Sequence, residues 1–392
     1  MIIDMDTHIL PRDVYDHMEG PTADLRPRFE YDKDGLLVKW SFPGEYRVKG
    51  STPLPPPGAG GKHLGLSNMD VRLEEYQKLG IDKQLLLSQF SAIYFNYTLD
   101  PALAIQMAHS HNIAILNLMK KYPDELIGAA LVAMQDVPTA ISEMEWAKKN
   151  GFQAIAMDKV FPVREHQFSE TLGSHRELWP FFKRAEELGM PIVLHNVQHG
   201  HRISNMMIFQ RDGLDTLCPA EGQMSLASLC TSGLFDDFPN LKMVFTEAGS
   251  AFIKPLLERL DAAFVKPPLN YEDEDATARF HRRVMPVSER LSAGKRLTSL
   301  EEYEVKNKKP VSEYFKKNLF FTIETEEPEL PESIEMLGAT QFLFATDYPH
   351  DDPGGRMKYK DVQLLRDNPR ITEEAKDIIR STSAAAMLPA LT

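Results

Sequence analysis

The chain has 392 residues, of which 43% are hydrophobic and 26% charged, as in an ordinary globular protein with a sizeable core. Its formal net charge is −13 and it contains no Lys/Arg-rich tract, which argues against nucleic-acid binding and against a polybasic membrane anchor. No apolar run approaches the ~20 residues of a membrane helix, and the N-terminal residues do not form a signal-peptide pattern. With two cysteines outside any zinc-knuckle spacing, we expect a cytoplasmic protein with reduced thiols.

Eight short apolar runs follow one another along the chain and predict eight strands. Each run is almost continuously apolar, as a parallel strand covered on both faces has to be. The runs span residues 1–6, 82–88, 126–133, 152–157, 191–194, 241–246, 319–322 and 342–346.

Helical patterns separate these runs, and four of them are distinct: 70–79, 101–122, 138–150 and 177–188. Strands that alternate with helices indicate βαβ units and a parallel sheet, and eight such units favour closure into a (β/α)8 TIM barrel. An open doubly wound sheet is the alternative, but no GxGxxG turn follows the first strand.

We expect one domain over residues 1–392, interrupted by two long insertions. Residues 17–69 follow the first strand and include a Pro/Gly-rich stretch, and residues 262–316 lie between the sixth and seventh strands. Such insertions in a barrel either shape the mouth of the active site or form an interface.

Side chains that bind metals stand at the carboxyl ends of four predicted strands. Asp6 and His8 close the first strand, His195 the fifth, and Asp347 the eighth. All strands of a barrel end on one face, so these side chains can converge, and residues i and i+2 of a strand point the same way. Two imidazoles and two carboxylates suit one divalent cation, with zinc, manganese and iron(II) as candidates. Taken singly, each residue could instead cap a helix or fill a turn, but their order along the strands favours the metal.

Four blocks of sequence carry a resemblance to a known family: DMDTHILP, LWPFFKRAEELGMPIVLHN, FPNLKMVFTEAGSAFIKPLLERLD and FLFATDYPHDDP. On these blocks the chain resembles, over nearly its whole length, the amidohydrolase superfamily and its branch related to 2-amino-3-carboxymuconate-6-semialdehyde decarboxylase. The resemblance implies a distorted (β/α)8 barrel and one metal ion held by Asp6, His8, His195 and Asp347. It also implies that Asp347 doubles as an acid/base group. Related enzymes are frequently homodimers, for which residues 262–316 could supply the interface.

The sequence departs from that family at two positions. Asp6 stands where many members have His, although several decarboxylases of the branch carry Glu there, so a carboxylate is tolerated. The sixth strand usually ends in His, but here it ends in Glu247. A glutamate would repel an anionic substrate unless it is protonated or paired, so Glu247 is a candidate catalytic residue with an altered role.

Further candidates surround these positions. His199 and His201 follow the fifth strand in HNVQHGHR, and His199 could supply the missing imidazole as a general acid. His201, Arg202, His350 and Lys159 are candidates for binding an anionic substrate. Solvated loop side chains are the alternative for each of them.

Three functions are compatible with these residues. The first is non-oxidative decarboxylation of an aromatic or muconate-like carboxylic acid, with an anionic aromatic or ring-cleavage product as substrate. The second is hydrolysis of an amide, an ester or an activated C–C bond through metal-bound water. The third is a barrel that binds a partner without catalysis. Family resemblance favours the first, whereas Glu247 favours the second.

Overall fold

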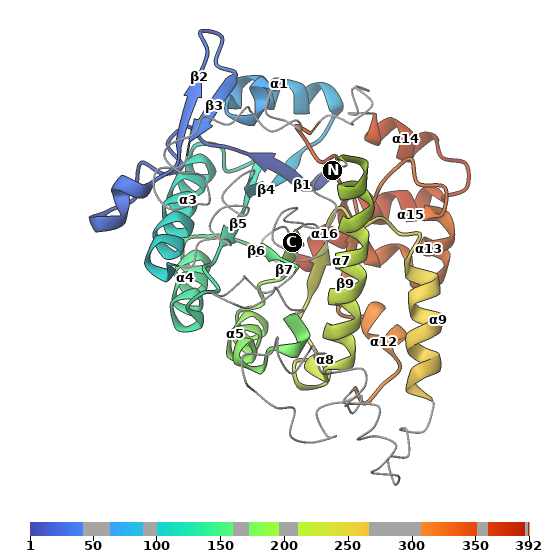
Figure 1. Ribbon diagram of the computed structural model, residues 1–392. Helices are drawn as coiled ribbons and strands as arrows, with labels where there is room; N and C mark the ends of the chain where they lie inside the picture. Colours follow the sequence, from blue (N-terminus) through green and yellow to red (C-terminus); the bar gives the residue numbers. More distant parts are fainter. Residues whose placement is uncertain are drawn as a thin grey trace.

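The computed structural model describes residues 1–41, 63–88, 100–159, 172–195, 211–265, 307–350, 360–388 and 391. Its centre is an eight-stranded sheet in which neighbouring strands are parallel, in the order β1-β4-β5-β6-β7-β8-β9-β10 (Figure 1). The strands are β1 (Ile3–Ile9), β4 (Lys83–Ser88), β5 (Leu126–Leu131), β6 (Ala154–Asp158), β7 (Ile192–His195), β8 (Met243–Phe245), β9 (Leu319–Thr322) and β10 (Phe342–Leu343).

The last strand returns to the first, which nearly closes the sheet into a barrel. The amide of Met5 donates to the carbonyl of Phe344 at 2.9 Å, and Thr7 pairs with Tyr348 in an isolated parallel bridge. Parallel strands of one barrel end on the same face, so the carboxyl ends of all eight strands open together.

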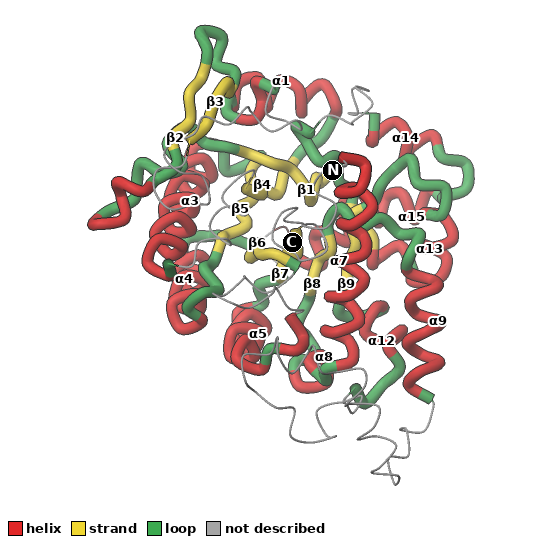
Figure 2. The backbone as a smooth tube through the Cα atoms, viewed as in Figure 1, coloured by secondary structure: helices red, strands yellow, loops and turns green. Residues whose placement is uncertain are grey.

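Helices surround the eight strands of this sheet, which form the inner ring in Figure 2. They are α1 (Met69–Leu79), α3 (Pro101–Lys121), α4 (Val137–Lys149), α5 (Trp179–Leu188), α7 (Arg211–Thr231), α8 (Leu234–Asp237), α9 (Ile253–Phe264), α12 (Val311–Phe315), α13 (Leu330–Leu337), α14 (Asp361–Asp367), α15 (Glu373–Asp377) and α16 (Ser383–Met387). Six shorter helical segments lie between them in the described part of the chain, and two of these, η2 (Leu64–Leu66) and η7 (Ile378–Thr382), pack near β1. No helix within these described ranges is both long and apolar enough to cross a membrane.

The helix ends follow local sequence signals. Asn68 accepts hydrogen bonds from the amides of Asp70 and Val71 at the start of α1, and Gly80 ends this helix with φ 71°. Asp100 caps α3 in the same way, with Pro101 in its first turn and two lysines in its last. The helices α1 and α3 precede β4 and β5 directly in the chain.

The strands are buried on both faces. All six residues of β5 are buried, and three of them are Gly or Ala. A Cβ at Gly128 would lie 2.4 Å from Met119 Sδ and 2.7 Å from a ring carbon of Phe152, so the small residue lets the neighbouring helix and loop approach the strand. Dense packing of this kind holds the strand ends rigidly.

All eight predicted strands are confirmed, and the barrel with them. The hairpin of β2 (Arg28–Tyr31) and β3 (Leu37–Ser41) was not predicted, because it lies in the first expected insertion. The Pro/Gly-rich stretch of that insertion lies outside the described residues, as do residues 266–306 of the second. The single-domain organisation stays a prediction. Cys230 is buried and free.

Candidate metal centre

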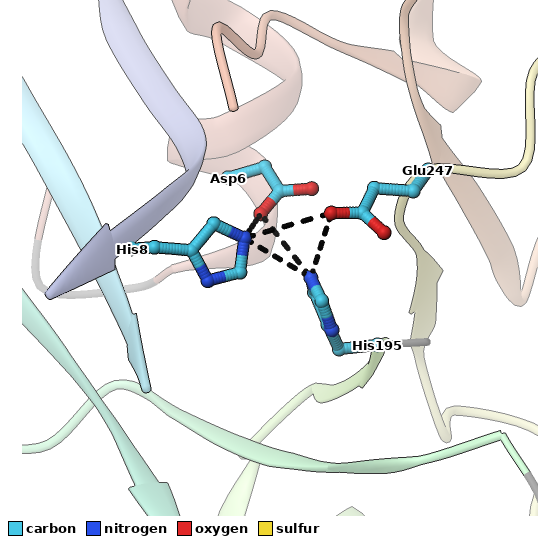
Figure 3. A group of neighbouring side chains, drawn as sticks. All are labelled: Asp6, His8, His195 and Glu247. Carbon is cyan, nitrogen blue, oxygen red and sulfur yellow. Dashed lines mark hydrogen bonds and ion pairs between the residues drawn. The ribbon is translucent and has the colours of Figure 1, made fainter. Parts of the chain in front are cut away.

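Asp6 and His8 leave β1 on the same face because successive side chains of a strand alternate. Each of the two residues is only 1% exposed. Both point into the barrel mouth, where β7 ends in His195 (Figure 3). Three potential ligands from two distant strands therefore face one point.

The two imidazoles converge through the same ring nitrogen. Nε2 of His8 and Nε2 of His195 lie 3.2 Å apart, and the two rings meet edge to face with centroids 4.7 Å apart. Bringing two ring nitrogens this close is unfavourable unless a proton or a cation lies between or beside them.

Carboxylate oxygens complete the cluster. Oε1 of Glu247, from the loop after β8, lies 3.1 Å from His195 Nε2 and 3.6 Å from His8 Nε2. Oδ1 of Asp6 lies 3.6 Å from His8 Nε2 and 3.9 Å from His195 Nε2. The four ligand atoms are all within 4.8 Å of one another. Bonds of about 2.0–2.2 Å to one shared zinc ion would place such atoms roughly 3–4 Å apart, so the spacing fits a single cation.

Asp347 joins the cluster from the segment that follows β10. Its Oδ1 lies 3.1 Å from His8 Nε2 and 2.8 Å from His350 Nδ1. The His350 ring stacks on the His8 ring, with centroids 4.1 Å apart and an interplanar angle of 11°. Asp347 therefore links the buried cluster to a third imidazole.

Two of these residues have an unusual backbone. Glu247 has φ 47° and Asp347 has φ 55°, and within the described part of the chain no other non-glycine residue has a positive φ. Left-handed backbone costs a residue with a Cβ about 1–2 kcal/mol. Strain of this kind concentrates at functional sites, where the surrounding structure enforces it.

Burial and mutual attraction set the charge of the cluster. Burial raises the pKa of Asp6 well above its usual value, in spite of the nearby histidines. Burial acts the same way on Glu247, but His195 and His8 outweigh it and hold the pKa of Glu247 well below normal. Burial alone would lower the pKa of His8, but hydrogen bonds to Asp347 and Glu247 raise it to about 10. The site thus concentrates negative charge that attracts either protons or a metal cation, and the two compete.

One orphaned atom points to the cation. Oδ1 of Asp6 is fully buried and accepts no hydrogen bond from any residue that the structure describes. A buried carboxylate oxygen without a partner is costly, and a metal ion would satisfy it. The donor set therefore fits a divalent cation of the borderline class.

The structure brings together three of the four residues predicted as ligands, Asp6, His8 and His195, and places the fourth, Asp347, against His8 in a second, overlapping group. Glu247, predicted as a catalytic residue, lies in the ligand cluster itself. Its position directly after an apolar run, as for the other four, was the signal that could have identified it.

The remaining candidates are placed differently. His350 contacts Asp347, as described above. Lys159 is fully buried, and its Nζ donates to the carbonyl of Thr246 at 2.5 Å, so its role towards a substrate stays a prediction. His199, His201 and Arg202 lie outside the described residues.

A parallel barrel with imidazoles and carboxylates gathered at the carboxyl ends of its strands is the arrangement of metal-dependent barrel proteins. The chain belongs to the amidohydrolase family, whose model matches residues 3–390.

A curated relative, 2-amino-3-carboxymuconate-6-semialdehyde decarboxylase of Dictyostelium discoideum, is 25% identical over 189 residues. The match covers 47% of this chain and 48% of the relative, so the chain spans about half the length of the curated relative it matches.

Solved structures with this fold match along the whole chain. A dihydroxybenzoic acid decarboxylase from Polaromonas sp. JS666, with bound manganese and the inhibitor 2-nitroresorcinol, has a TM-score of 0.67 and 18% identity, covering 100% of this chain and 97% of that one. A 5-carboxyvanillate decarboxylase from Sphingomonas paucimobilis has a TM-score of 0.66 and 21% identity, covering 99% and 98%.

Proposed function

We propose that the protein is a metal-dependent carboxy-lyase that removes carbon dioxide, without oxidation, from an aromatic or muconate-like carboxylic acid. The observation that carries the proposal is the cluster of imidazoles and carboxylates at the barrel mouth, in two overlapping groups that share His8 and Glu247. The similarity to decarboxylases, both in sequence and in fold, supports the choice of reaction.

The proposed ligands are Asp6, His8, His195 and Asp347, with Glu247 as a fifth. We expect zinc to be the bound metal. The alternatives are iron and manganese, the metal in the structure of the Polaromonas decarboxylase. The bound ion would act as a Lewis acid that orients the carboxylate and a neighbouring hydroxyl of the substrate. A cytoplasmic location and a homodimer stay predictions.

Asp347 and His350 are placed to move the proton that decarboxylation needs. The Nδ1 atom of His350 lies 2.8 Å from Oδ1 of Asp347, so a proton can be held by the imidazole while the carboxylate stabilises the positive charge of the imidazolium. The acid delivers a proton to the ring carbon, the bond from that carbon to the carboxylate breaks, and its electron pair restores the ring as carbon dioxide leaves. His199, in the loop after β7, is the alternative acid.

One observation favours a second candidate, the hydrolysis of a neutral substrate. The carboxylates of Asp6, Glu247 and Asp347, when ionised, exceed the charge of a divalent cation by one. An excess negative charge in a buried site opposes an anionic substrate. An ester, an amide or a vinylogous diketone would not meet this repulsion.

The test starts from metal content and carbon dioxide release. The purified protein is analysed for metal, then incubated with 2,6-dihydroxybenzoate, 5-carboxyvanillate and other hydroxybenzoates while carbon dioxide is measured. We expect a stoichiometric metal and turnover of at least one acid. If no carbon dioxide is released but esters or vinylogous diketones are turned over, the carboxy-lyase proposal is wrong and the hydrolase proposal is supported. If the purified protein contains no stoichiometric metal, the third function, a barrel that binds a partner without catalysis, is supported instead.

Substitutions test the assignment of the site. His195→Ala and Asp347→Asn should each abolish turnover, and His195→Ala should also lose the metal. His17→Ala is the matched control, because it removes a partly exposed imidazole that pairs with Asp13 on the surface. Near-wild-type metal content and turnover in both site variants would refute the site.

A further inference from the structure

Asp4 lies on β1 directly before the proposed ligands. The pairing of β1 with β4 shifts register between Asp4 and Thr7, so the simple alternation of side chains is interrupted between Asp4 and the proposed ligands. Asp4 is fully buried, yet its carboxylate does not belong to either group of potential metal ligands. A buried carboxylate outside the site needs a different explanation.

The carboxylate of Asp4 accepts four hydrogen bonds. Oδ2 accepts from the hydroxyl of Thr346 at 2.5 Å and from the hydroxyl of Tyr76 at 2.9 Å. Oδ1 accepts from the amide of Thr346 at 3.1 Å and from the amide of Asp6 at 3.3 Å. Every partner is a donor, and two of the four belong to the residue that precedes Asp347.

Thr346 connects Asp4 to the turn that contains the left-handed residue Asp347. Its hydroxyl oxygen also accepts a hydrogen bond from the amide of Tyr348 at 3.2 Å. The amide of Asp347, between them, donates to the carbonyl of Asp6 at 3.0 Å. The left-handed conformation of Asp347 is therefore held from both sides by bonds that lead to β1.

Arg72 also contacts both β1 and the turn at Asp347. Its Nη1 donates to the carbonyl of His8 at 2.7 Å, and its guanidinium carbon lies 4.7 Å from the centre of the Tyr348 ring. The network thus contacts the backbone of His8 as well as the turn at Asp347, while none of its side chains belongs to either group of potential metal ligands.

We infer that Asp4 is a positioning residue that clamps β1 to the turn at Asp347 and thereby sets the affinity of the site for its metal. The inference rests on the metal site of the proposed function but not on the reaction it performs. Aspartate is required because all four partners donate: the amide group of an asparagine would oppose one donor with another. Groups that orient metal ligands in this way typically change metal affinity 10- to 100-fold when they are altered.

The experiment measures zinc affinity in chelator-stripped protein by competition with a chromophoric chelator, alongside the urea denaturation of the same samples. We expect Asp4→Asn and Thr346→Val each to weaken zinc binding roughly 10- to 100-fold. The double variant should bind no more weakly than the worse single variant, since both changes open one clamp. Thr346→Ser keeps the hydroxyl and should bind within a few-fold of wild type.

Asn112→Ala is the matched control. Asn112 is equally buried, and its side chain joins α3 to both backbone groups of Leu131 in β5 at 2.8 Å, but it supports no proposed ligand. It should lose stability without losing zinc affinity.

Each outcome is decisive. Wild-type zinc affinity in Asp4→Asn, or an equal loss of affinity in Asn112→Ala, would overturn the clamp. If Asp4→Asn does not fold, equal zinc affinities of the Val and Ser variants at Thr346 would overturn it. Failure of the wild-type protein to bind zinc or manganese stoichiometrically would instead refute the proposed function, so the two failures are distinguishable.

Discussion

The buried His111 should make the fold sensitive to mild acid. This residue lies in α3 with no exposed surface, and its Nδ1 is 3.4 Å from Oδ1 of Asn112. Its Nε2 has no hydrogen-bond partner among the residues that the structure describes. Burial lowers the pKa of His111 from 6.5 to about 4, because the imidazolium would have to give up its hydration.

The sign and size of the effect follow from proton linkage. Below about pH 6.5 His111 is protonated in the unfolded chain, whereas in the folded chain it stays neutral down to about pH 4. Because the unfolded state binds the additional proton, acid favours unfolding. Each unit of pKa difference is worth about 1.4 kcal/mol, so the full effect is about 3 kcal/mol. Between about pH 7.5 and about pH 5, the loss attributable to this one group is about 2 kcal/mol.

The measurement is urea denaturation of metal-free protein at both pH values, for the wild type and for His111→Leu. Effects of the substitution that do not depend on pH cancel when each protein is compared with itself. We expect the wild type to lose about 2 kcal/mol more than the variant between the two conditions. An equal loss in both proteins would show that His111 titrates alike in the folded and unfolded chains, and would refute the argument from burial.

Two further predictions concern the support of the metal centre. A Cβ at Gly65 would lie 1.7 Å from the hydroxyl of Tyr348, so Gly65→Ala should cost about 2–3 kcal/mol in urea denaturation and weaken zinc binding. Gly189→Ala meets open space at φ 61°, so it should cost only about 1 kcal/mol and keep wild-type zinc affinity; equal effects of the two changes would contradict the packing argument. Glu327 accepts hydrogen bonds of 2.6 to 2.9 Å from Ser250 and Ala251, in the loop that follows Glu247. Glu327→Ala should therefore weaken zinc binding about tenfold in the same competition assay. An unchanged affinity would show that this loop does not support the metal site.

Local patterns in the sequence determined much of the architecture. A strand covered on both faces has to be apolar along its whole length, so the eight strands could be read as runs of apolar residues. A polar side chain at the end of such a run interrupts its apolar character, which is why Asp6, His8, His195 and Asp347 could be proposed one by one as candidate ligands. Capping residues and glycines likewise marked the ends of the helices.

Only the tertiary structure decided how these residues combine. Glu247 could be read as a catalytic residue of altered role, but its distance from His195 depends on how β7 and β8 pair. The clamp from Asp4 to Thr346 joins positions 342 residues apart in the chain, and it holds the left-handed turn of Asp347. Contacts of this range leave no periodic trace in the sequence, because they arise only when the last strand of the barrel returns to the first.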